Sequence, residues 1–103
     1  MTAVPATVET AAETETAFGG RAPAWSPAGL VWVELAPDPP REAGGGDRPP
    51  ERTQAATARA RAHPALAPGV RLLAGDGPPW TVRALRPDDP APGRVVLSLD
   101  RLL

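Results

Sequence analysis

Three short apolar runs alternate with polar segments in the second half of the chain. They are Val70 to Leu73, Trp80 to Leu85 and Val95 to Leu99, and the segments between them are rich in Gly, Pro and Asp. Short apolar runs separated by turn-forming residues are typical of antiparallel strands joined by tight connections. The pattern therefore predicts a β-meander.

Alternation within these runs predicts which side chains face the core. Successive side chains of a strand point to opposite faces, so Trp80, Val82 and Ala84 share one face of the second run. Every second residue from Val95 to Leu99 forms the matching apolar face of the third run. We therefore expect one apolar sheet face.

The connections between the three runs differ in kind. Gly75 to Gly77 is short, and because glycine adopts positive φ at no steric cost, it predicts a hairpin between the first two runs. Arg86 to Gly93 contains three prolines, which cannot donate to a strand ladder. We expect that second segment to be an exposed loop.

The first half of the chain contains three further candidate strands. Val4 to Glu9 alternates around Pro5, which predicts an edge strand. Arg21 to Trp25 is a short candidate that ends at Ser26-Pro27. Leu30 to Ala36 is apolar on both faces, which predicts a central strand.

The segment Ala55 to His63 allows two interpretations. Alanine and arginine favour a helix, whereas the strict alternation of alanine with Thr57, Arg59, Arg61 and His63 has the period of a strand. We favour the strand because the segment adjoins the meander.

Together these patterns predict an all-β fold, a small antiparallel β-barrel or sandwich in a single domain covering residues 1–103. The predicted core is formed by the inward residues of the apolar runs, namely Val31, Trp32, Val33, Leu72, Trp80, Val82, Val95 and Leu97.

Pro37 to Gln54 is the segment with the least capacity to fold on its own. It contains five prolines, three consecutive glycines and no large apolar residue, so we expect a long irregular loop that neighbouring chains would order. Gly44 to Gly46 lacks the context of a phosphate-binding loop. The residues expected to contact a channel or partner are Arg41, Glu42, Gly44, Gly45, Gly46, Asp47 and Arg48.

Composition and charge indicate a domain that depends on neighbours. Hydrophobic residues make up 42% of the 103, and many of them are alanine, which predicts a thin core. Residues 1–36 carry one arginine against four acids, whereas residues 53–103 carry seven arginines against four acids. Such halves suit head-to-tail contact between copies, and we expect Arg59, Arg61 and His63 at a subunit interface.

Candidate chemistry is sparse. His63 is the single histidine, and neither Ser26 nor Ser98 lies in a nucleophile-elbow motif, so we expect no catalytic residues. One histidine without cysteine does not suit a transition-metal site, and we expect no metal or other cofactor. The beginning of the chain lacks the features of a signal peptide, and no apolar run reaches membrane-spanning length, so we expect no membrane contact.

The order of these elements resembles the head-closure proteins of tailed phages and of phage-derived gene transfer agents. The resemblance extends from Thr7 to Arg101. It is carried by Val31-Trp32-Val33-Glu34, by Gly75 to Val82, by the alternating segment ending at His63, and by the closing strand that follows Gly93.

The resemblance implies a small β-barrel that forms a ring in the particle neck, with a hexamer favoured and a dodecamer as the alternative. It implies a portal-bound adaptor on the head side, a tail terminator on the tail side, and non-specific proximity to packaged double-stranded DNA. Assembly in the bacterial cytoplasm and a stopper role that closes the DNA channel follow from the same resemblance.

Two other classes of function remain open at this stage. One is a stand-alone β-barrel module that captures a peptide or single-stranded nucleic acid, which exposed aromatic residues near the long loop would favour. The other is a small hydrolase, which needs His63 beside a serine.

Overall fold

The computed structural model describes residues 3–15, 19–43, 51–75, 77–88 and 92–103, and every regular element within these ranges is a β-strand. The strands are β1 (Ala3–Glu15), β2 (Arg21–Pro37), β3 (Arg41–Ala43), β4 (Glu51–Arg61), β5 (Arg71–Ala74), β6 (Trp80–Pro87) and β7 (Arg94–Leu102). The predicted all-β class is confirmed. None of the described residues belongs to a helix that could span a membrane.

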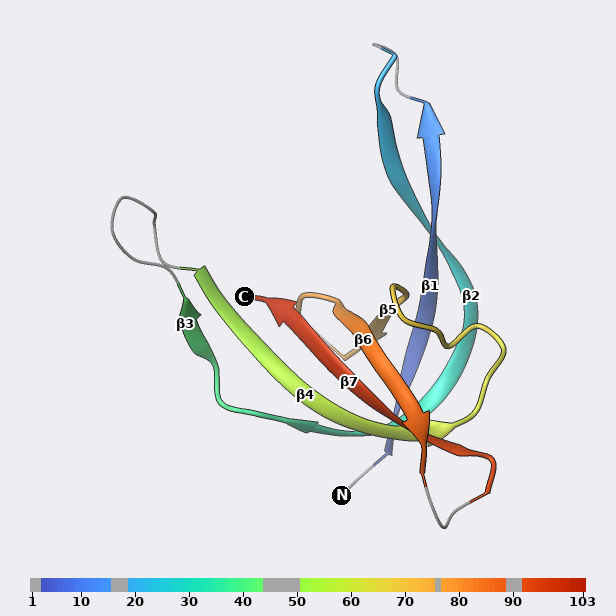
Figure 1. Ribbon diagram of the computed structural model, residues 1–103, viewed down its shortest axis with the longest axis vertical. Helices are drawn as coiled ribbons and strands as arrows, with labels where there is room; N and C mark the ends of the chain where they lie inside the picture. The colour runs from blue at the N-terminus through green and yellow to red at the C-terminus, as the bar shows by residue number, and fades with distance from the viewer. Residues whose placement is uncertain (1–2, 16–18, 44–50, 76, 89–91) are drawn as a thin grey trace.

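Six of the described strands close into an antiparallel barrel. Their order is β2-β1-β5-β6-β7-β4, and β4 pairs back onto β2 to complete the ring (Figure 1). The short strand β3 pairs with β4 outside this ring. Strands β5, β6 and β7 form the predicted meander, and β5 and β6 form the predicted hairpin.

The barrel interior contains large side chains on most strands and alanine on β4. All the core positions predicted from the sequence are buried except Trp32. The buried cluster comprises Ala6, Val8, Val31, Val33, Ala56, Ala58, Ala60, Leu66, Val70, Leu72, Trp80, Val82, Val95, Leu97 and Leu99. A closed barrel of six strands leaves little interior space, which explains why one whole strand contributes only small side chains.

The prediction that Trp32 belongs to the core is wrong. Its side chain is 62% exposed, whereas its neighbours Val31 and Val33 are 6% and 0% exposed. Alternation requires residues on either side of Trp32 to face opposite to it. Because both faces of this segment are apolar, the sequence pattern did not determine which face points inward.

Strand β2 is continuous where two strands were predicted. The expected break at Ser26-Pro27 is absent, and Pro27 pairs with Glu9 of β1. A register shift between Val8 and Glu9 accommodates this region. Before Val33, β2 has β1 as its one described partner strand, so a proline here does not interrupt a second ladder.

The alternation predicted for β6 fails after Val82. The register against β7 shifts between Val82 and Ala84, so Ala84 is exposed and Leu85 packs against the core instead. A bulge of this kind places two residues opposite one and reverses the faces that follow it. Nothing in the local sequence marks the position of the bulge.

The expectation that all of Pro37 to Gln54 is irregular is also wrong. Pro37 ends β2, β3 pairs with the first residues of β4, and Gln54 lies within β4. Backbone pairing stabilises these short strands without any large apolar side chain. Residues 44–50 lie outside the described residues, so the mobility of the segment stays a prediction.

The strand interpretation of Ala55 to His63 is confirmed through Arg61. Alanines 56, 58 and 60 face the core, and Arg59 and Arg61 face outward. His63 follows the end of β4. Burial of the alanine face in the barrel outweighs the helix propensity of alanine and arginine.

Arg101 links three elements near one end of the barrel. Its guanidinium carbon lies 4.1 Å from the centre of the Trp80 ring, and its Nε and Nη2 donate to Oε1 of Gln54 at 3.1 and 2.8 Å. Nη1 donates to the carbonyl of Pro78 at 3.3 Å. The arginine therefore links β7 to β4 and to the turn before β6.

We expect Arg101→Ala to lower the free energy of unfolding by about 1 to 2 kcal/mol, because it removes a partly buried cation–π contact and hydrogen bonds from a charged donor. Arg101→Lys keeps the charge but not the paired hydrogen bonds to Gln54, so it should lower the free energy of unfolding by less than Arg101→Ala does. Urea denaturation of the two variants measures both values. Equal stability of Arg101→Ala and the wild type would contradict the expectation.

Candidate interaction surfaces

The predicted channel or partner loop lies beside a groove. Arg41 and Glu42 are exposed on β3, where they pair in register with Thr53 and Arg52 of β4. Gly44, Gly45, Gly46, Asp47 and Arg48 lie outside the described residues. The groove has a volume of about 690 Å³ and is lined by residues of β3, β4, β6 and β7 and of the segments before β3 and β6.

The charges around this groove largely neutralise one another. Nε of Arg83 donates to both carboxylate oxygens of Asp100, at 2.9 and 2.8 Å. This hydrogen bond, together with the charge of Asp100, raises the pKa of the Arg83 guanidinium above its ordinary value. Arg101 at the groove is engaged by Gln54 and Trp80, as described above. The groove lining therefore carries three arginines against two aspartates, a smaller excess of positive charge than four arginines beside one glutamate would give.

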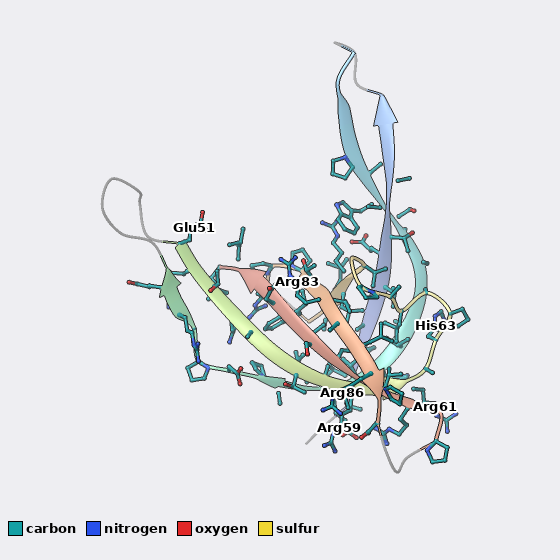
Figure 2. The ribbon with its side chains drawn as sticks, in the orientation of Figure 1. Glu51, Arg59, Arg61, His63, Arg83 and Arg86 are labelled. Carbon is teal, nitrogen blue, oxygen red and sulfur yellow. The ribbon has the colours of Figure 1, made fainter. Side chains whose placement is uncertain are left out.

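Four arginines gather on the outer surface near the other end of β4. Arg61 of β4 lies directly opposite Arg94 of β7, and Val96 of β7 has Arg59 on one side and Arg86 of β6 on the other. Figure 2 shows Arg59, Arg61 and Arg86 at the same end of the barrel. We call Arg59, Arg61, Arg86 and Arg94 the arginine face.

A single ion pair is described within the arginine face. Nη2 of Arg94 lies 3.5 Å from Oε1 of Glu34 on β2, and both side chains are partly exposed. Val96 is only 5% exposed, and its cross-strand neighbours on either side are Arg59 and Arg86. Like charges directly across a strand pair are unfavourable, so the pairing of Arg61 with Arg94 favours an anionic partner.

The arginine face adjoins two exposed apolar side chains. Leu30 and Trp32 of β2 are 60% and 62% exposed. Together with Arg61, Ala62 and His63 they line a hollow of about 260 Å³. Exposed tryptophan and arginine side chains on one surface are typical of protein–protein interfaces.

His63 has a structural position at this hollow. The backbone N–H of Ala65 donates to its Nδ1 at 3.0 Å. The ring also lies against Gly29 of β2, where a Cβ atom would come within 2.7 Å of its Cε1. The histidine therefore shapes the turn after β4. The described residues contain no cluster of metal-ligating side chains.

The first hairpin extends beyond the barrel as a two-stranded arm. We define the arm as residues 9–15 of β1 and 21–27 of β2, which pair from Glu9↔Pro27 to Glu15↔Arg21. Figure 1 shows it rising away from the other strands. The Cα radius of gyration is 15.4 Å, above the value of roughly 13 Å expected for a compact chain of this length.

A side-chain cluster fixes the base of the arm to the barrel. Nε of Arg71 on β5 donates to Oε1 of Glu9 at 2.6 Å, and the Arg71 guanidinium carbon lies 4.3 Å from the centre of the Trp25 ring. An isolated two-stranded hairpin has marginal stability in water. The cluster therefore orients the arm where it leaves the barrel.

Sequence reasoning found part of these surfaces. Arg59 and Arg61 share the outer face of β4 and His63 lies at the hollow beside Arg61, while their place at a subunit interface stays a prediction. Arg86, Arg94 and the exposed Trp32 were not assigned to the same region. The residues that the sequence did not assign to this region come from β6, β7 and β2, and strand pairing alone brings them beside β4. Alternation of arginine and alanine in β4 was the one local signal.

The fold is similar to that of a chain from a solved particle. In the structure titled "Virion of native gene transfer agent (GTA) particle", the similar chain superposes with a TM-score of 0.73 at 20% sequence identity. The match covers 96% of this chain and 93% of that chain. No protein-family model and no curated protein matches the sequence. The two chains therefore share the barrel fold over nearly their whole lengths.

Proposed function

We propose that this chain is a structural component of a phage-like particle, located in the neck as the stopper of the head–tail connector. The observation that carries the proposal is the match of nearly the whole fold to a chain of a gene transfer agent virion. The order of elements along the sequence resembles that of head-closure proteins, and this resemblance supports the neck position in the proposal. In this proposal the chain has no catalytic activity.

The proposed stopper forms a ring, of six copies in the favoured form, between the adaptor on the portal and the tail terminator. Exposed Trp32 and the arginine face provide surfaces for contacts between chains. The β3–β4 hairpin projects from the barrel (Figure 1) and is the proposed channel element. Its strand β3 lies outside the closed ring of strands, so it can contact other chains or DNA while the barrel stays folded.

The proposal is tested by deleting residues 41–50 in a particle-producing strain. The barrel should remain folded, because β3 lies outside the ring of strands and loop length has a weak effect on closure entropy. Particles that carry the deletion should package DNA but leak it or fail to join tails. Nuclease protection of the DNA and electron microscopy of the particles measure the two outcomes.

A control substitution outside the deleted segment, Ala67→Ser in the exposed turn before β5, should behave as wild type. A second strain lacks the chain altogether, and it should accumulate DNA-filled heads without tails that lose their DNA. Normal tail joining and DNA retention in that strain would overturn the stopper proposal. If only the deletion variant is normal, the hairpin is a spacer and the channel element lies elsewhere.

A further inference from the structure

Two surfaces of the chain complement each other and lie at opposite ends of the molecule. The arm rises at one end, and Arg59, Arg61 and Arg86 lie at the other (Figure 2). By sequence the arm beyond its base carries Glu13 and Glu15 against Arg21, since Glu9 is paired with Arg71, whereas the arginine face contains four arginines near one glutamate. Surfaces at opposite ends cannot meet within one copy, but they can meet between copies.

The arm is suited to docking because its base is already ordered. Arg71 contacts both Glu9 and Trp25, so the arm leaves the barrel in a defined direction. A preordered segment loses less conformational entropy when it binds. Beyond the base, residues 10–15 of β1 have β2 as their one described partner strand.

The arginine face fits this arm better than the groove does. Arg83 and Arg101 in the groove are engaged by Asp100 and Gln54. By contrast, the ion pair between Arg94 and Glu34 is the one described for the arginine face. Unbalanced charge of one sign attracts a surface of the opposite sign.

We propose that the arm of one copy docks on the arginine face of the next copy, with its exposed small side chains against Leu30 and Trp32. The described exposed residues of the arm include Ala11, Ala12, Pro23 and Ala24. The contact is heterologous, since two different surfaces meet, and it propagates around a closed ring. The inference rests on the proposed stopper ring and names its subunit contact.

A second copy suits this surface better than a nucleic-acid backbone. The surface combines arginines with two large exposed apolar side chains, Leu30 and Trp32. A phosphate backbone balances the arginines, but only a protein partner also buries the apolar area. The arm supplies both carboxylates and small apolar residues in one element.

Cysteine cross-linking tests the contact, because the natural chain contains no cysteine. Ala12→Cys places a thiol on the arm, and Ala62→Cys places one at the hollow that Leu30 and Trp32 line. An equal mixture of the two purified variants, oxidised at low salt, should give a disulfide-linked dimer. Either variant alone should give at least about tenfold less, because a heterologous contact never brings like positions together.

Charge reversal then tests the chemistry of the contact. Arg59→Glu with Arg61→Glu in the Ala62→Cys chain should reduce the cross-linked product at least about tenfold, because the net negative arm then meets negative charge in place of positive charge. Adding Glu13→Arg with Glu15→Arg to the Ala12→Cys chain should restore it. The matched control, Arg41→Glu with Arg52→Glu, changes the net charge equally at the other end of β4 and should leave the product unchanged.

Three results would overturn the inference: no mixed dimer, equal dimer from a single variant, or a mixed dimer insensitive to charge reversal. Binding of a random 30-base-pair duplex that Arg59→Glu with Arg61→Glu abolishes, without any mixed dimer, would assign the face to DNA instead. Mass spectrometry of purified particles for this chain tests the proposed function separately. If the chain is present in particles but the cross-link does not form, the subunit contact is refuted and the proposed function is not.

Discussion

Replacing Trp80 by alanine is expected to lower the free energy of unfolding by about 3 to 5 kcal/mol, which is the usual cost of truncating a buried tryptophan. The Trp80 side chain is 1% exposed and is the largest of the fully buried ones described. It also supports Arg101, whose guanidinium stacks on its ring. The variant should therefore lose the core packing of Trp80 and its stacking contact with Arg101 together.

Small domains have a total stability of about 5 to 15 kcal/mol, so Trp80→Ala should be insoluble or largely unfolded at room temperature. Circular dichroism and urea denaturation measure the change. The matched control is Trp32→Ala, which removes an exposed tryptophan and should change stability by about 0.5 kcal/mol or less. Similar stability losses for the two variants would contradict the burial of Trp80.

Enlarging Ala58 to leucine is expected to destabilise the barrel by about 1 to 3 kcal/mol, the usual cost of overpacking a core. Ala58 is fully buried and lies directly between Leu35 of β2 and Leu97 of β7. The same arrangement recurs one row along, where Ala60 lies between Val33 and Val95. Because the inward side chains of β4 are small, the larger side chains of β2 and β7 fill the interior space beside it.

A volume exchange makes the Ala58 prediction specific. The double variant with Ala58→Leu and Leu97→Ala should lose less unfolding free energy than the sum of the losses of the two single variants. The reason is that the new leucine side chain fills the space that Leu97 vacates. Ala55→Leu, on the exposed side of β4, is the control and should have little effect. Thermal denaturation of the four variants gives the coupling, and strict additivity would show that the two sites do not share space.

The outer surface shows which neighbouring residues a local sequence pattern predicts and which it does not. Alternation in β4 predicted that Arg59 and Arg61 share a face, and the structure confirms it. Arg86 and Arg94 join them through cross-strand pairing over large sequence separations. Such pairing depends on strand order and register, which no short segment of the chain specifies.

The sequence by itself determined the all-β class, the meander of β5 to β7 and most of the core, because period-two alternation and turn residues act locally. Barrel closure, through the pairing of β2 with β4, was decided only in the tertiary structure. The same holds for the outward orientation of Trp32 and the face reversal at the β6 bulge. Segments apolar on both faces pack either way in isolation, so competition for the small barrel interior decides which side chains are buried.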